Sequence, residues 1–351
     1  MRGASMASAR CPRRRALRGL AALALVPLAG CVAPRAGDGA VAGLNRPLAA
    51  ASPGAAPASG SQPSPEPAAL PMVLSIDDGP MLATLTLLSP AQRHDAMRAA
   101  LAHERVEAVM FMTAGFGADR PEGLALAQAW AAAGHRLANH TVSHLDLHDP
   151  AVTLDRYLAE IDACEALGRT LPHWRRWFRA TYLNAGRDAA QRQALREALA
   201  ARGYTLAEVD LDSRDWQFAG PLQAQLLSTP DARAPAVQAL RTRFLQQLDE
   251  RTAALAAAAR AELRERAAHA PAAVPGGGST GARAAAADPA SRTAHPRPQV
   301  LLVHDQLPMA LWLPEVLALM RRHGFVFVAP EHAWPPAPRP LRAGLAYTAQ
   351  N

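Results

Sequence analysis

Short apolar runs alternate with longer helical patterns along most of this chain, and this alternation constrains the fold more than any other feature. From Met72 onwards, most runs are followed by a stretch whose apolar residues recur at helical spacing. The expected strands are 72–76, 106–112, 136–139, 177–178, 204–211, 300–303 and 325–328, and the expected helices are 122–133, 154–167, 188–201 and 314–323. Repeated strand and helix units of this kind predict an α/β fold with a parallel sheet or barrel.

One block, between residues 221 and 298, interrupts the alternation. It is rich in Ala, Arg, Gln and Glu, with helical character over about 232–268 and a low-complexity stretch around 276–279. We interpret it as an insertion made of amphipathic helices and a flexible loop. A solvated excursion is the simplest expectation for it, and an arm that grips a substrate or docks a partner is the alternative.

The first 31 residues have the three parts of an export signal. Arginines at the start are followed by a short apolar run, 19–29, and by small residues ahead of Cys31. The run is too short to span a bilayer, which takes about 20 apolar residues. Because Leu-Ala-Gly-Cys resembles a bacterial lipobox, we expect export to the cell envelope and a lipid anchor on Cys31 at the periplasmic face of a membrane. An ordinary signal peptide that contains a cysteine is the alternative.

The rest of the chain is expected to hold one folded domain. Residues 32–70 are rich in Pro, Ala, Gly and Ser with few large apolar side chains, which predicts a disordered tether. Residues 71–340 are the expected domain, and 341–351 are a C-terminal tail. Of the three cysteines only Cys164 lies in the domain, so no internal disulfide is expected there.

The basic character of the whole chain comes from the leader. The leader holds six of the 37 Lys and Arg residues and none of the 30 Asp and Glu residues. Without it the chain has 31 basic against 30 acidic residues, a net charge of about +1. Nearly equal numbers of basic and acidic residues give no reason to expect nucleic acid as a partner.

Two histidines four positions apart, His140 and His144, are the clearest candidates for metal binding. They directly follow the third expected strand. Imidazoles at this spacing suit one divalent metal, although two unrelated surface histidines give the same pattern. Asp78, just after the first expected strand, offers a third ligand. Two nitrogens and one oxygen suit a catalytic zinc-like ion that keeps an open position for water.

Asp77 and Asp78 are consecutive carboxylates at the end of a strand. Successive side chains that leave a strand point to different sides, so one can bind a metal while the other faces the reacting water. The same geometry argues against a glycosidase pair, whose carboxylates face each other across a sugar bond. A plain turn is the alternative, since Asp, Gly and Pro are common turn residues.

Further polar residues also lie at the carboxyl ends of expected strands. Arg179 and Tyr182 follow 177–178, Asp210, Asp212, Asp215 and Trp216 lie at or after the end of 204–211, and His304 and Asp305 follow 300–303. In a βα barrel the active site collects at these ends. We therefore expect the polar residues to share one site, although each alone also suits an ion pair or a core position. The pair Asp210 and Asp212 leaves open which acidic residue meets the site.

Together these segments resemble the polysaccharide deacetylases of the NodB-homology type, carbohydrate esterase family 4. The similar motifs are 75–80 (family pattern T-F-D-D-G-P), 134–144 (H-[ST]-x-x-H with its flanks), 178–182 (R-x-P-Y), 212–216 (D-x-x-D-W) and 301–305. They cover about 72–328 apart from the insertion. The resemblance implies a distorted (β/α)7 barrel in which the insertion precedes the strand that leads to His304.

The resemblance also implies a metal and a base. Zinc, with cobalt or nickel as alternatives, would be bound by Asp78, His140 and His144. Asp77 would be the general base for the attacking water, oriented by Arg179.

On the opposite side of the implied site, His304 would be the general acid for the leaving amine, tuned by Asp215. The backbone N–H of Tyr182 would help to hold the tetrahedral oxyanion, and Trp216 would wall the acetyl pocket. Amide hydrolysis needs all of these groups, because an amide is a poor electrophile with a poor leaving group. Thr181 stands where the family usually has proline, next to the implied oxyanion donor.

The expected function is a metal-dependent deacetylase that acts on an N-acetylated polysaccharide or oligosaccharide such as peptidoglycan, poly-N-acetylglucosamine or chitin. Removal of O-acetyl groups from xylan by the same residues is one alternative. A catalytically inactive, glycan-binding lipoprotein is the other. A serine hydrolase is not expected, because no G-x-S-x-G nucleophile motif occurs.

Overall fold

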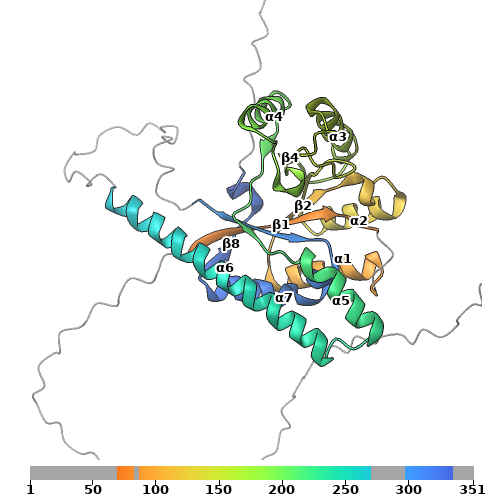
Figure 1. Cartoon of the computed structure of the whole chain (residues 1–351), viewed down its shortest axis with the longest axis vertical. Helices are drawn as coiled ribbons and strands as arrows, with labels where there is room; N and C mark the ends of the chain where they lie inside the picture. The colour runs from red at the N-terminus through yellow and green to blue at the C-terminus, as the bar shows by residue number, and fades with distance from the viewer. Residues whose placement is uncertain (1–68, 83–86, 270–296, 335–351) are drawn as a thin grey trace, which may run out of the picture. The chain divides into compact units, whose positions relative to one another are not determined.

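Within the residues that the computed structural model describes, 69–82, 87–269 and 297–334, the strands form one parallel sheet (Figure 1). Its hydrogen-bonded order is β5-β4-β3-β2-β1-β7-β6, and β8 also pairs with β1. The strands are β1 (Leu70–Gly79), β2 (Ala108–Met112), β3 (Arg136–Asn139), β4 (Trp174–Phe178), β5 (Thr205–Leu206), β6 (Leu211–Asp212), β7 (Gln299–His304) and β8 (Phe325–Phe327). Because β1 is central and pairs with β2, β7 and β8, its carboxyl end lies in the middle of the sheet edge.

Helices connect most of the strands. They are α1 (Pro90–Glu104), α2 (Pro121–Ala132), α3 (Leu154–Gly168), α4 (Ala189–Ala201), α5 (Trp216–Ser228), α6 (Pro235–Ala268) and α7 (Leu307–Arg322), with the 3₁₀ helices η1 (Ala114–Phe116), η2 (Thr181–Leu183) and η4 (Pro330–His332). Local signals start several of them: Ser89 and Gln92 form a capping box on α1, and Asp188 caps α4.

The curled parallel sheet with its helices confirms the predicted α/β fold of the distorted (β/α)7 barrel type. The single strand predicted over 204–211 is wrong, because two short strands lie there. β5 pairs with β4, and β6 pairs with β7. Among the described strands β5 and β6 are not hydrogen-bonded neighbours, so the barrel is open between them.

Two helices differ from the sequence-based expectation. Helix α1 was not expected, because two of its buried positions are the polar residues Arg93 and His94, which break the apolar period. Helix α7 begins at Leu307 rather than near Pro314. Pro308 stands in its first turn, where a backbone N–H has no partner to lose, and Pro314 is accommodated inside the helix.

Helix α6 is part of the core rather than a solvated excursion. In Figure 1 it is the long helix beside α5 and α7. Its buried side chains include Val237, Phe244, Leu248 and Ala256, which join the main hydrophobic cluster together with residues of β1 and α7. The Phe244 ring is stacked on Trp312 of α7 at 5.6 Å between centroids. The solvated interpretation of the insertion is therefore wrong for this helix.

Several expectations lie outside the described residues. These are the signal segment with Cys31, residues 32–68 of the tether, the 270–296 part of the insertion and the tail 341–351. Cys164 is buried on α3 and has a free thiol. In the described ranges, no helix has both the length and the apolar character that crossing a membrane requires.

Candidate active site

The carboxyl ends of the strands enclose a cavity of about 370 Å³. Its lining residues are Asp77, Asp78, His140, His144, Tyr182, Leu183, Asp212, Trp216, Leu302 and His304. Asp77, near the end of β1, lies directly opposite His304, which ends β7, because the two are register partners in the sheet. The sheet thus gathers residues that are more than 200 positions apart in the sequence.

Three side chains in this cavity form a cluster with the spacing of a metal site. One ligand atom each of Asp78, His140 and His144 lies within 4.8 Å of the others. The Nε2 atoms of His144 and His140 are 3.3 and 3.7 Å from Asp78 Oδ1. Two imidazole nitrogens and a carboxylate oxygen are a donor set that fits zinc or a similar transition metal.

The ring of His140 is held in the orientation and tautomer that metal binding needs. Its Nδ1 lies 2.8 Å from the carbonyl oxygen of Arg179, and since a carbonyl only accepts, Nδ1 carries the proton. Nε2 therefore keeps its lone pair on the side of Asp78. Burial lowers the pKa of His140 to about 3, so the ring is neutral around pH 7.

The loop that carries the two histidines has a strained backbone. Thr141 and His144 have φ angles of 72° and 58°, in the left-handed region that such residues rarely adopt. The Asn139 side chain accepts the Thr141 N–H at 2.9 Å. Glu160 of α3 accepts the next N–H along the chain at 3.1 Å and the Ser143 hydroxyl at 2.9 Å. These bonds hold the histidines in place.

Asp77 lies beside the metal cluster and has a free oxygen. The residue is 2 % exposed, and its Oδ1 has no hydrogen-bond partner. Burial raises the pKa of Asp77, and the nearby Arg179 guanidinium partly opposes this effect. Arg179 Nη1 is 3.8 Å from Asp77 Oδ2, while Nη2 donates to the Ser75 hydroxyl at 3.2 Å. Asp77 is thus a buried carboxylate able to take up a proton.

His304 faces the same cavity and is paired with a buried carboxylate. Its Nδ1 is 2.8 Å from Asp215 Oδ1, and its backbone N–H donates to Oδ2 at 3.0 Å. Burial disfavours the charged ring, but the Asp215 carboxylate outweighs burial and raises the pKa of His304 to about 9. The imidazole is therefore protonated around pH 7, and Nε2 is the nitrogen left to donate a proton.

The structure decides which acidic residue of 210–215 meets the site. Asp215 contacts His304, as predicted from the fourth motif. Asp212 lines the cavity but its side chain accepts the Arg214 N–H at 2.8 Å. Asp210 does not line the cavity, and it accepts the Val300 N–H at 2.8 Å. Asp210 is thus a structural residue of the β6–β7 pair.

Tyr182 and Trp216 lie at the rim of the cavity. They are 63 % and 48 % exposed, and the Tyr182 ring lies 4.4 Å from the His144 ring between centroids. Thr181, which replaces the family's proline, is buried, and its backbone N–H donates to the Tyr157 hydroxyl at 3.0 Å. Proline has no N–H and could not make this bond. The Thr181–Tyr157 hydrogen bond therefore supports the backbone next to Tyr182 in a way that the family's proline could not.

A buried charged network behind the site was missed in the sequence. Asp305 accepts from Arg93 Nε at 2.8 Å and from the Met81 N–H at 2.7 Å, and its Oδ2 lies 2.9 Å from His94 Nε2. Despite burial, His94 and Arg93 hold the pKa of Asp305 well below its ordinary value. The network ties the end of β7 to the segment after β1. In the sequence, the consecutive polar residues Arg93 and His94 were the available signal of this network.

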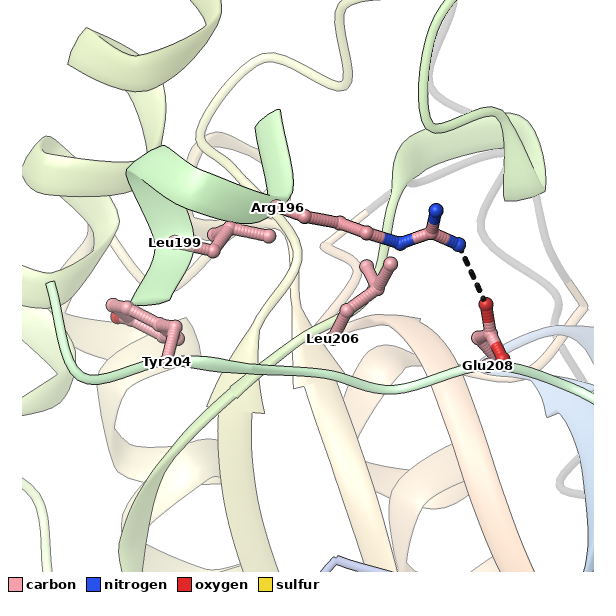
Figure 2. A pocket seen from close by; sticks show the side chains of 5 residues that line it. All are labelled: Arg196, Leu199, Tyr204, Leu206 and Glu208. Atoms are coloured by element: carbon pink, nitrogen blue, oxygen red, sulfur yellow. Dashed lines mark hydrogen bonds and ion pairs between the residues drawn. The ribbon is translucent and has the colours of Figure 1, made fainter. Parts of the chain in front are cut away.

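A second cavity, of about 330 Å³, lies beside α4 and β5 (Figure 2). Its lining residues are Arg196, Leu199, Tyr204, Leu206 and Glu208. Figure 2 shows the Arg196 guanidinium extended toward Glu208, with 3.4 Å between the paired atoms. The second cavity shares no lining residue with the first cavity and holds none of the metal-binding cluster. The candidate active site is therefore the first cavity.

Comparisons with known proteins agree with the motifs. Residues 66–205 match the family model described as polysaccharide deacetylase. The match includes Asp77, the metal cluster and Arg179, and it ends before Asp215 and His304. A search of curated proteins finds no matching relative.

Solved structures give distant similarities. A chitin deacetylase from Colletotrichum lindemuthianum has 17% identity and a TM-score of 0.47, over 76% of this chain and 88% of that one. A family 4 carbohydrate esterase from Streptomyces lividans has 18% identity and a TM-score of 0.42, over 75% and 93%. A family 4 pseudoenzyme from Bacillus anthracis has 14% identity and a TM-score of 0.42, over 75% and 64%. Identities and TM-scores as low as these add nothing to the family match over residues 66–205.

Proposed function

Because residues 66–205 match the polysaccharide deacetylase model, we propose that the chain is a member of that family and a metal-dependent hydrolase that removes N-acetyl groups from a glycan. One observation carries the proposal: a metal-type cluster, a buried carboxylate with one unpartnered oxygen and a protonated histidine share one cavity. Amide hydrolysis adds water across the C–N bond and yields acetate and a free amine. The cluster, the carboxylate and the histidine correspond to the Lewis acid, the general base and the general acid that this reaction needs.

Asp78, His140 and His144 are the residues that would hold the metal, zinc in the first place, with cobalt or nickel as alternatives. When bound, a divalent ion of this kind supplies Lewis acidity and makes water nucleophilic near neutral pH. The unpartnered Oδ1 of buried Asp77 beside the cluster supports the fit, because that atom needs a hydrogen-bond donor.

Asp77 takes the proton of the attacking water through this oxygen. Its raised pKa suits a general base, since a carboxylate at its ordinary pKa is a weak one near pH 7. Arg179 limits that rise, and its Nη1 lies 3.8 Å from Asp77 Oδ2. Burial and Arg179 thus act in opposite directions on the pKa of Asp77.

His304 donates a proton to the nitrogen of the leaving amine, which cannot depart as an anion. Asp215 keeps the ring protonated and in the required tautomer. The Tyr182 N–H stabilises the oxyanion, and Trp216 walls the pocket for the acetyl group. The exposed faces of Tyr182 and Trp216 also suit the apolar face of a sugar ring.

Peptidoglycan, poly-N-acetylglucosamine and chitin are the proposed substrate class. We also infer that the protein is exported to the cell envelope with a lipid on Cys31, an inference that rests on the leader sequence alone. Labelling with a radioactive fatty acid tests the anchor, since Cys31→Ser should remove the label.

The function is tested by acetate release from N-acetylated oligosaccharides and acetylxylan, with and without a chelator and zinc. Wild type is compared with Asp77→Asn and His140→Ala. Release from N-acetylated substrates that the chelator and both substitutions abolish is the expected result. Release from acetylxylan alone would instead identify an O-acetyl esterase. Oligosaccharide binding by the zinc-loaded protein without any release would identify an inactive glycan-binding protein.

A further inference from the structure

Helix α6 of the insertion reaches the acid side of the site through one arginine. Arg251 Nη1 donates to the carbonyl oxygen of Asp212 at 2.7 Å, and Nη2 donates to that of Ser213 at 3.0 Å. Its Nε donates to the Gln247 carbonyl of its own helix at 3.0 Å. The planar guanidinium therefore joins α6 to two consecutive carbonyl groups of the 212–215 loop.

This loop sets the position of Asp215. The Ser213 hydroxyl donates to Asp215 Oδ1 at 2.8 Å, and Asp215 in turn contacts both the ring and the backbone N–H of His304. Arg214, between them, has a φ of 56°, which is unfavourable for a residue with a side chain. A strained loop of this kind keeps its conformation only if its surroundings hold it.

We propose that Arg251 is a positioning residue that holds the 212–215 loop so that Asp215 stays in register with His304. The proposal rests on the proposed function, in which His304 is the proton donor. It assigns the insertion a role in the reaction, because the proton-donating half of the site depends on a helix that lies between the fourth and fifth motifs in the sequence.

Attachment of α6 to the domain does not explain why an arginine stands at position 251. The helix is already held by buried apolar residues that include Phe244 and Leu248. Burial, followed by the nearby charge of Arg214, lowers the pKa of Arg251, so its surroundings disfavour the positive charge. A residue that served only to anchor the helix would be stabilised more simply as an apolar side chain.

Arg241, ten positions earlier on α6, provides a matched control. It pairs with Glu315 of α7, with 2.9 Å between Nη2 and Oε1, and it does not line the cavity of the candidate active site. Arg251→Ala and Arg241→Ala each remove one partly buried arginine from the same helix. Only the first removes contacts to the 212–215 loop.

The experiment compares wild type, Arg251→Ala, Arg251→Lys and Arg241→Ala as full-length, zinc-loaded protein. We expect kcat of Arg251→Ala to fall roughly tenfold to a hundredfold, because small misplacements of catalytic groups have effects of this size. KM and zinc affinity should stay near wild type. Arg251→Lys should recover part of kcat, because an ammonium group reaches one carbonyl, and Arg241→Ala should keep the wild-type kcat.

A second readout is the titration of the His304 ring, followed by NMR with labelled histidine and assigned with His304→Gln. The charges that face this ring are Asp215 from the loop and Asp77 and Asp78 from β1. A looser Asp215 contact should move the His304 titration to lower pH in Arg251→Ala but not in Arg241→Ala.

Equal kcat values and equal His304 titrations in the two alanine variants would overturn the proposal. If zinc-loaded wild type releases no acetate, the proposed function fails, yet the His304 titration still decides whether Arg251 positions Asp215. An unchanged titration in Arg251→Ala would then refute the positioning role as well.

Discussion

Two loops flank the site, and they are held in different ways. The metal-side loop, residues 139–144, is fixed by its own Asn139 and by Glu160, 17 positions from Ser143. The acid-side loop, residues 212–215, is fixed by Arg251, 38 positions from Ser213, and meets His304, 89 positions from Asp215. Both loops contain left-handed residues that need such support. The metal-side loop is therefore supported by residues near it in the sequence, and the acid-side loop is supported by more distant residues.

This difference between the loops should separate effects on metal binding from effects on proton transfer. Substitutions on the metal side should change metal content first, because the ligands and their supports lie together. Substitutions on the acid side should change the reaction while the metal stays in place. The largest effects are expected where a ligand itself is lost.

His140→Ala should remove bound zinc and reduce acetate release to the background rate. Two ligands remain, which is fewer than the three protein ligands that catalytic zinc sites use. The zinc content per protein after dialysis and the rate of acetate release, measured on the same sample, check both expectations. A variant that keeps one zinc per chain would show that another residue binds the metal, and the comparison of the loops would lose its basis. His148→Ala, a histidine on the same connection but outside the cavity, is the control.

Asp215→Asn should keep its zinc but lower kcat by roughly a hundredfold to ten thousandfold, the range that general acid catalysis contributes. The carboxylate raises the pKa of His304 to about 9, so its loss should lower that pKa toward the ordinary value of 6.5. The protonated acid then exists only at lower pH, and the alkaline limb of the kcat profile should move in that direction. A pH–rate profile from pH 5 to 10 checks the shift. An alkaline limb that stays in place would show that another group donates the proton.

Leu248→Ala tests whether α6 is part of the core. The side chain is fully buried in the main cluster, so we expect the free energy of unfolding to fall by about 2–5 kcal/mol. Denaturant unfolding measures the change, and Leu245→Ala, a partly buried neighbour, should cost less. A stability equal to wild type would mean that the helix is a solvated excursion after all.

The two loops also differ in how far the sequence reveals them. His140 and His144 are four positions apart and Asp78 directly follows a strand, so spacing and strand ends predict the metal side. The strand ends of a parallel fold also bring His304 to the same edge. The contact of Arg251 with the 212–215 loop has no local signal, because it depends on how a 34-residue helix packs on α5 and α7.

Two errors in the sequence interpretation have the same cause. Helix α1 was hidden because Arg93 and His94 occupy core positions where they pair with Asp305, more than 200 residues away. The strand predicted over 204–211 divides because its two halves pair with different strands, β4 and β7. In each case a partner distant in sequence overrides the local pattern.

Glu160→Gln should have the smallest effect and gives the sharpest test of the comparison. Glu160 supports the metal-side loop as Arg251 supports the acid-side loop, but it acts on the backbone beside His144 rather than on a proton donor. We expect roughly tenfold weaker zinc affinity, as for other residues that orient metal ligands. At saturating zinc, kcat should return to near wild type, because Asp77 and His304 are unchanged. Zinc titration in a competing chelator, with kcat measured at each zinc concentration, separates the two quantities. If kcat stays low at saturating zinc, the two halves of the site are coupled, and the division between metal binding and proton transfer does not hold.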